Sequence, residues 1–307
     1  PSETMFYRPG MRYRPRNKYV LQYHPTVYYH DADGYIPGLK LKRNYGINEE
    51  LNFDLNVGAE TGMPYWEISG WRRYLHSGMR KYDYRLYDFG GVRGFGISTS
   101  NKLNPTSPTS LTVGLSVTDV ADVKRTNLFD RGLVSVVSFK LNDSRLDDAS
   151  IIIDFSPGGI SDWSFTRLTF EDKFEKKTKL FGARNRDILG WIWSDTKGVP
   201  VQERFTVEGA GSATMLQKGY LRDASSFYGD LDLRNQYHLP GDANLRAFGN
   251  QNFVGVEGIL ADSFEAFVHK KIGPVTAEVA AFIDSGILFG SKFEPNDQLF
   301  DNTTLMD

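Results

Sequence analysis

The chain has 307 residues, a length that fits either one large β-barrel or two domains of ordinary size. Its 36 lysines and arginines against 38 aspartates and glutamates give a net charge of −2, so it lacks the basic field that drives nucleic-acid binding, and we expect no nucleic-acid partner. Cysteine is absent, which excludes disulfides, thiolate metal sites and thiol nucleophiles.

Period-two alternation of apolar and polar residues recurs from residue 19 to residue 288, and we predict an all-β fold. The first alternating segments are residues 18–30 and 52–60. One face of these segments is predicted to be apolar (Leu21, Tyr23, Val27 and Tyr29, then Phe53, Leu55 and Val57). The clearest segment is 110–125, which places Leu111, Val113, Leu115 and Val117 opposite Thr112, Gly114, Ser116 and Thr118.

Turn-forming residues divide the chain between these segments. Residues 31–34 predict a tight hairpin turn, and the polar stretches 101–110 and 142–150 predict loops. The glycine-rich stretch 90–96, GGVRGFG, lies inside the long segment 81–100 and predicts a strand bend or bulge.

Strand length distinguishes two kinds of alternating β protein. The predicted segments 18–30, 64–76, 81–100, 110–125, 162–177 and 178–195 exceed the usual five or six residues of globular strands. Strands that cross an outer membrane need about 9 to 11 residues and often continue beyond the bilayer. The pattern favours a transmembrane antiparallel β-barrel of about 12 to 16 strands. A soluble β-sandwich that binds glycans through exposed Tyr and Trp is the alternative.

The longest irregular stretch, 196–252, is rich in aromatic residues, so we expect it to be packed rather than disordered. It precedes the alternating runs 263–271 and 275–288. In the second run Asp284 falls on the polar face, where a carboxylate needs a partner. Arg246 is the candidate, because a guanidinium is planar and always charged.

These residues carry a resemblance to a known family. The segments LRAF (245–248) and FIDSG (282–286) resemble the Val-Arg-Gly-Phe/Tyr loop and the Phe-x-Asp-x-Gly strand of the bacterial surface-antigen barrels, with Ala247 in place of the loop glycine. That superfamily includes the central subunit of the barrel-assembly machinery and the transporters of two-partner secretion. The resemblance implies a long loop folded into the lumen, an Arg246–Asp284 lock supported by Phe248, Phe282 and Gly286, and a role as membrane anchor or as translocation or assembly pore.

A narrower resemblance concerns the segment VPVQERFTVEGAG ahead of LRAFGN, which is similar to the C-terminal barrel of some membrane-associated metallopeptidases of the aminopeptidase N type. A peptidase needs His-Glu-x-x-His, and the five histidines are scattered without that spacing. The stretch GAGSA (209–213) is not the Gly-x-Ser-x-Gly elbow of a serine hydrolase. We therefore predict no catalytic residue, metal site or cofactor within these residues. A catalytic domain would have to precede them.

The membrane prediction also sets the expected domains and partners. Residues 1–17 are expected to form a periplasmic linker, 18–288 the barrel with 196–252 as its inward-folded loop, and 289–307 a loop of a chain incomplete at its C-terminus. The expected partners are the bilayer of a Gram-negative outer membrane and other outer-membrane or periplasmic subunits. Aromatic residues near the predicted strand ends are candidates for an interfacial girdle, with core packing as the alternative: Tyr19, Tyr28, Tyr29, Trp66, Trp71, Tyr74, Trp191 and Trp193.

Overall fold

The fold is all-β, as the alternation predicts. The computed structural model describes residues 2–4, 19–30, 34–45, 48–74, 80–104, 106–121, 129–143, 145, 149–206, 220–221, 242–243, 255–272 and 275–293. In these residues the only helix is the single-turn η1 (Val201–Glu203). No helix of this described part is both long enough and apolar enough to cross a membrane.

The strands follow one another as hydrogen-bonded neighbours in chain order. Their bounds are β1 (Ser2–Thr4), β2 (Tyr19–His30), β3 (Gly34–Tyr45), β4 (Glu49–Val57), β5 (Pro64–Tyr74), β6 (Arg80–Phe89), β7 (Val92–Lys102), β8 (Thr109–Val120), β9 (Gly132–Asp143), β10 (Ala149–Ser156), β11 (Phe165–Lys177), β12 (Phe181–Ser194), β13 (Tyr220–Leu221), β14 (Gly255–Ile272) and β15 (Val275–Phe293). The two shortest strands, β1 and β13, each pair with β2 in parallel. The other thirteen strands form an antiparallel order from β2 to β15, so the prediction of a single antiparallel strand series is confirmed.

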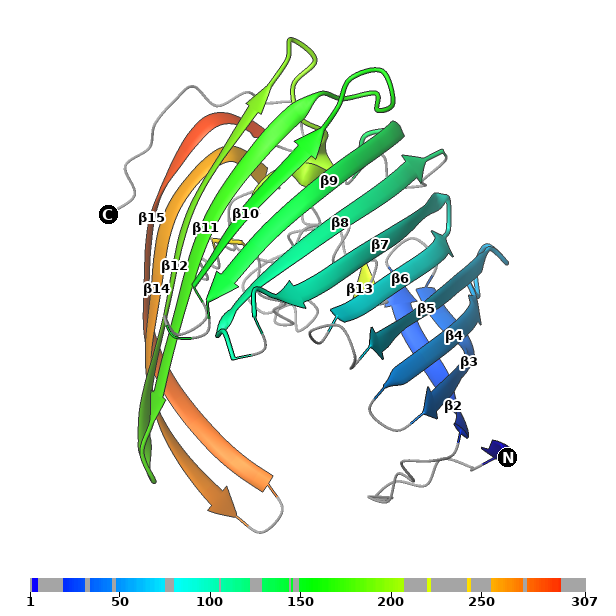
Figure 1. Cartoon of the computed structure of the whole chain (residues 1–307), viewed down its shortest axis with the longest axis horizontal. Coiled ribbons are helices and arrows are strands. Elements are labelled where there is room, and N and C mark those ends of the chain that lie inside the picture. Colours follow the sequence, from blue (N-terminus) through cyan, green and yellow to red (C-terminus); the bar gives the residue numbers. More distant parts are fainter. Residues whose placement is uncertain are drawn as a thin grey trace. The chain divides into compact units, whose positions relative to one another are not determined.

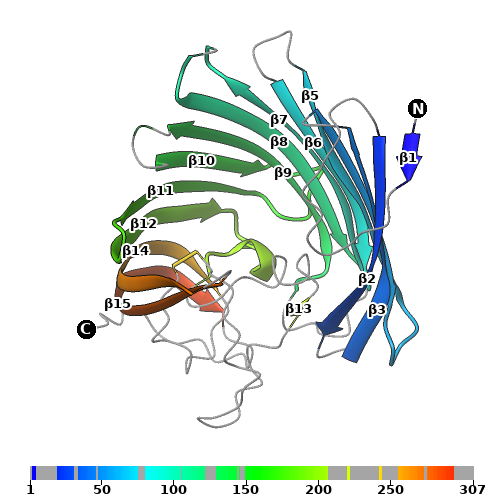
Figure 2. The same ribbon diagram turned by 90° about the horizontal axis from the view of Figure 1, so that it is seen from below.

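The chain divides into two compact units. Unit 1 consists of Pro1–Phe139, Phe155–Trp163 and Ser212–Asp223, and unit 2 of Lys140–Asp154, Ser164–Gly211 and Ala224–Asp307. In unit 1, strands β2 to β8 lie side by side as a meander (Figure 1). In unit 2, β11, β12, β14 and β15 lie side by side in that order (Figure 2).

Two opposite faces characterise the sheet of unit 1. Antiparallel pairing places Thr112, Gly114, Ser116 and Thr118 of β8 on the face that carries Ser100, Ser98, Gly96 and Gly94 of β7. Leu111, Val113, Leu115 and Val117 lie on the other face, none of them buried. We call the two sides the polar face and the apolar face. Because side chains alternate strictly along a strand, the sequence alone predicts this division, and the register confirms it.

One predicted strand is wrong in its bounds. Residues 81–100 form two strands, β6 and β7, joined by a two-residue turn at Gly90 and Gly91 with φ of 60° and 99°. Positive φ at both central positions is the geometry of the tight hairpin turn that twists with its strands, and glycine adopts it without steric strain. The glycines of GGVRGFG therefore make a turn and then an unbroken register of β6 with β7, in place of the predicted bend or bulge.

The same two faces recur in unit 2. On β11, Arg167, Thr169 and Glu171 share the polar face, whereas Leu168 and Phe170 are exposed on the apolar one. β14 and β15 are the longest strands of the described chain, with 18 and 19 residues, and their register shifts once, between Val256 and Gly258. Val279 and Ile283 on the apolar face of β15 are 77% and 71% exposed. Large apolar side chains on both units thus lie outside the protein's own core.

Candidate functional site: the polar face and its internal segment

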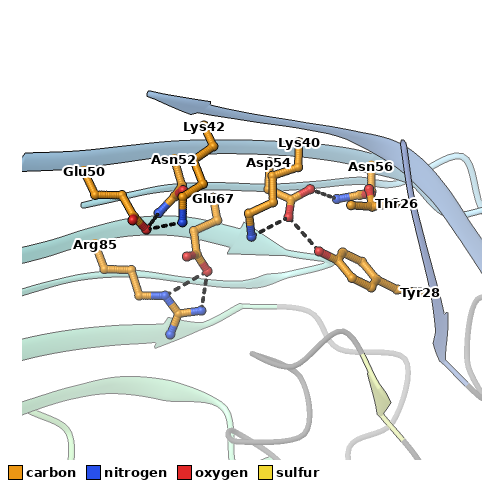
Figure 3. Close-up of polar contacts among 10 residues, drawn as sticks. All are labelled: Thr26, Tyr28, Lys40, Lys42, Glu50, Asn52, Asp54, Asn56, Glu67 and Arg85. Atoms are coloured by element: carbon orange, nitrogen blue, oxygen red, sulfur yellow. Dashed lines mark hydrogen bonds and ion pairs between the residues drawn. The ribbon is translucent and has the colours of Figure 1, made fainter. Parts of the chain in front are cut away.

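The polar face of unit 1 is a network of ion pairs and hydrogen bonds between neighbouring strands (Figure 3). Asp54 on β4 is buried at its centre. Its Oδ2 accepts a hydrogen bond from the Tyr28 hydroxyl at 2.6 Å and lies 3.5 Å from Lys40 Nζ, and its Oδ1 accepts one from Asn56 Nδ2 at 2.7 Å. Asn56 Oδ1 in turn accepts a hydrogen bond from Thr26 Oγ1 at 2.6 Å. The carboxylate is therefore satisfied by side chains from β2, β3 and β4.

Two further acidic residues continue this network along the sheet. Lys42 Nζ lies 2.7 Å from Glu50 Oε1, which also accepts a hydrogen bond from Asn52 Nδ2 at 3.1 Å. Glu67 Oε2 accepts two hydrogen bonds from Arg85, from Nε at 2.9 Å and from Nη2 at 2.6 Å. Each acid has a cation on an adjacent strand, so the face is hydrophilic but close to neutral. Such pairs suit a wet, partly enclosed surface, where a lone charge would be costly at a buried position such as Asp54.

A different arrangement covers the polar face of unit 2. Arg167 on β11 lies 2.7 Å from Asp154 Oδ2 on β10 and donates a second hydrogen bond, from Nη1, to the backbone carbonyl of Glu203 at 2.9 Å. Its Nη1 is also 3.6 Å from the Glu203 carboxylate. The Asp154 side chain is only 5% exposed. One guanidinium thus joins two strands of the sheet to the irregular chain that follows β12.

That irregular chain, residues 199–206, packs onto the sheet, and we call it the internal segment. Phe205 is 2% exposed, and its backbone exchanges hydrogen bonds of 3.0 and 2.9 Å with Val256. Its ring lies so close to Gly190 that a Cβ there would come within 2.3 Å of it. Val199 and Val201 are also buried. Since the packing is apolar and the anchors are hydrogen bonds to the backbone, this part of the stretch 196–252 is folded, as predicted from its composition.

A hydrogen-bonded pair ends the internal segment. Asp242 Oδ2 accepts hydrogen bonds from the backbone N–H of Thr206 at 2.9 Å and from its hydroxyl at 3.2 Å. The Thr206 hydroxyl accepts one from the Asp242 backbone N–H at 2.8 Å. Burial raises the pKa of the nearby Glu203 carboxyl above its usual range, and Asp154 and Asp242 add to that rise while Arg167 opposes it. Glu203 of the segment and Asp242 beside it are therefore acidic groups that share the positive charge of Arg167 with Asp154.

The predicted Arg246–Asp284 lock is described at one end only. Arg246 and Phe248 lie outside the described residues. Asp284 lies on the polar face of unit 2, opposite Ser263 in the β14/β15 register, and its Oδ1 accepts a hydrogen bond from Ser263 Oγ at 2.7 Å. Phe282 and Gly286 share that face by alternation. The register places Asp284 on the face that alternation predicts, whereas its role in the motif and its pairing with Arg246 stay predictions.

The girdle candidates fall on different faces. The register places five of them on the apolar face, and their role in a girdle stays a prediction: Tyr19, Trp66, Tyr74, Trp191 and Trp193. Tyr28 and Trp71 lie on the polar face, so their assignment to the girdle has to be corrected: Tyr28 binds Asp54, and Trp71 contacts the cationic groups of Arg73 and Lys81. The side chain of Tyr29 is outside the described part. Tyr28 is in phase with Thr26, and Trp71 is in phase with Ser69, so the sequence alone could have assigned both residues to the polar face.

Arg167, Asp154 and Ser263 are site residues that the motifs missed. Arg167 alternates in phase with Thr169 and Glu171, and Asp154 with Ser150 and Ser156, so their common polar face was readable. The contact of Arg167 with Glu203 could not be predicted from the sequence, because no periodicity relates a strand to an irregular segment. In the part of the chain that the structure describes, no group of three His, Asp or Glu side chains could hold a metal ion.

These features define a β protein with a satisfied polar face, an apolar face that the chain itself leaves exposed, and an internal segment on part of the polar face. Comparison with protein-family models finds no match, and comparison with curated protein sequences finds none either. Among solved structures, the chain is similar to BamA from Haemophilus ducreyi lacking POTRA domains 1–3, at 15% sequence identity and a TM-score of 0.48. The alignment covers 89% of this chain and 58% of that one, so the chain spans little more than half the length of that structure. At this identity and score the match is a likeness only, and the chain's own residues have to carry any functional statement.

Proposed function

We propose that this chain is a transmembrane β-barrel of a Gram-negative outer membrane, of the surface-antigen type, that serves as a membrane anchor or as a translocation or assembly pore. The observation that carries the proposal is the exposed apolar face. Leu39, Ile97 and Leu189 on this face are 44%, 52% and 52% exposed. Burying a side chain of this kind is worth roughly 1.5–3 kcal/mol, so a face lined with them is costly in water and stable in lipid.

The polar face of the sheet gives a second argument for the same proposal. A soluble β-sandwich buries an apolar face between two sheets and leaves the polar one in water. Here the polar face carries buried carboxylates with dedicated partners, such as Asp54 and Asp154, and the internal segment packs on it. A lumen that is hydrophilic and partly filled by the protein's own chain would have such a face, which supports the proposal. The glycan-binding alternative has no comparable support.

The experiment is extraction and gel mobility of the chain expressed with an export signal. A barrel should remain in the membrane fraction after washing with carbonate or urea, require detergent for release, and migrate differently before and after boiling. Release into buffer by washing, with the same mobility at both temperatures, would exclude the barrel and favour a soluble sheet.

The finer part of the proposal concerns the interior. We assign the internal segment and the rest of the stretch 196–252 to closing the lumen, with Arg246 paired to Asp284 as the second anchor. Replacing Asp284 with Asn should loosen this anchor and raise the conductance of the protein in planar bilayers, with more frequent openings than in the wild type. Ser263→Ala removes a neutral partner of the same carboxylate and should change the conductance less. Equal conductance of Asp284→Asn and the wild type would contradict the lock. The link to a metallopeptidase stays a hypothesis about sequence outside this chain.

A further inference from the structure

A band of tyrosines and arginines crosses the apolar face of unit 1 at one end of its strands. It runs over β2 to β6 where Tyr19 pairs with Tyr45, Glu49 with Arg72, and Tyr74 with Arg80. We call this set the tyrosine–arginine belt, and its members are Tyr19, Arg43, Tyr45, Glu49, Arg72, Tyr74, Arg80 and Tyr82. Towards the middle of the strands the same face continues with exposed Leu21 and Tyr84. The belt therefore borders the apolar zone.

The belt contains two stacked pairs of the same kind. The guanidinium of Arg43 lies over the ring of Tyr19 at 5.1 Å, and that of Arg72 over the ring of Tyr74 at 5.0 Å. Each tyrosine has an aromatic neighbour, Tyr45 at 4.7 Å and Tyr82 at 5.6 Å between ring centroids. A guanidinium that stacks on a ring keeps its N–H groups in its own plane, so their edges stay available to an acceptor.

The charges of the belt do not balance. Glu49 is shared by two arginines: its Oε1 accepts a hydrogen bond from Arg43 Nη2 at 2.6 Å, and its Oε2 lies 4.0 Å from Arg72 Nε. The side chains of Arg43 and Arg72 remain 45% and 58% exposed. Arg80, beside Tyr74 in the register, adds a third exposed arginine. Three cations against one acid leave positive charge at the border of an apolar surface.

We propose that the tyrosine–arginine belt binds the phosphate of an anionic glycerophospholipid such as phosphatidylglycerol. The inference rests on the proposed membrane location and adds a specific ligand to it. Guanidinium edges donate paired hydrogen bonds to phosphate oxygens, and tyrosines favour the headgroup level of a bilayer. The acyl chains then lie along the apolar zone that begins at Leu21 and Tyr84. Three arginines against Glu49 leave an excess of two positive charges, which is enough for the single charge of a phosphodiester but not for the two fully ionised phosphomonoesters of a lipid A molecule.

Native mass spectrometry of the detergent-purified chain, titrated with phosphatidylglycerol, tests this. We expect retained phosphatidylglycerol adducts, no comparable retention of diacylglycerol with the same acyl chains, and binding at least about tenfold weaker in the double variant Arg43→Gln/Arg72→Gln, because charge-assisted hydrogen bonds are the strong ones. Millimolar inorganic phosphate should not displace the lipid. The matched control is Arg93→Gln, an arginine on the same face at the opposite strand end that is 62% exposed and paired with its own acid, Asp119. It should bind as the wild type does.

A second variant keeps the test decisive if the double variant does not fold. Glu49→Gln removes the acid that competes for both arginines, so it should tighten binding severalfold. Unchanged affinity in Glu49→Gln, wild-type affinity in the double variant, equal retention of diacylglycerol, or displacement by lipid A would each overturn the proposal. Heat-dependent gel mobility measured on the same samples separates the outcomes. A protein that shifts on boiling but binds no phosphatidylglycerol refutes the belt alone, whereas one that never shifts refutes the barrel.

Discussion

The two units provide partners for the acidic side chains of their polar faces in different ways. In unit 1 the acids Asp54, Glu50 and Glu67 each have a cation on a neighbouring strand, and Glu67 and its partner Arg85 remain about one-fifth exposed. In unit 2 the chain covers part of its own polar face, and Arg167 joins the Asp154 carboxylate to a backbone carbonyl of the internal segment. The comparison shows that a similar ion pair is a local contact in one unit and a tertiary anchor in the other.

The largest expected effect comes from removing that anchor. Arg167→Met leaves the nearly buried Asp154 carboxylate without its cation and the Glu203 carbonyl without a donor, so we expect a loss of about 3 kcal/mol in the free energy of unfolding. The measurement is urea unfolding of the refolded protein in detergent, followed by tryptophan fluorescence. Arg85→Met in unit 1 is the matched control and should cost about 1 kcal/mol or less, because Glu67 stays accessible to water. Equal losses of unfolding free energy in the two variants would contradict the proposed difference between the two units.

A smaller effect is expected where the internal segment touches the sheet through apolar contact. Gly190→Ala places a methyl group 2.3 Å from the Phe205 ring, and such overpacking costs about 1–3 kcal/mol. Gly96→Ala on β7 of unit 1 is the control, since a Cβ there meets its nearest atom at 3.8 Å. Increased cleavage of the segment by a protease in Gly190→Ala, but not in Gly96→Ala, would show that the ring holds the segment down. Identical cleavage patterns would argue that hydrogen bonds alone hold it.

The sequence predicted most of the fold because its signal is local. Alternation assigned Leu111 and Thr112 to opposite faces and placed Asp284 on the polar one, and the register agrees. The same alternation assigns Tyr28 and Trp71 to the polar face, whereas the girdle prediction relied on their aromatic character and not on their position in the strand. The two-residue turn at Gly90 and Gly91 was missed because two glycines inside a long alternating run also fit a bend.

By itself, the sequence determined the strands and the chemical character of each face, since side-chain direction in a strand depends only on the parity of the residue position. Only the tertiary structure decided which charges meet. Arg167 finds Asp154 on the next strand but Glu203 on an irregular segment 36 residues further along the chain, and Arg43 and Arg72 converge on Glu49 from two different strands. Such contacts depend on register and on the path of the connecting chain, and both are set by the packing of the whole sheet rather than by any local pattern.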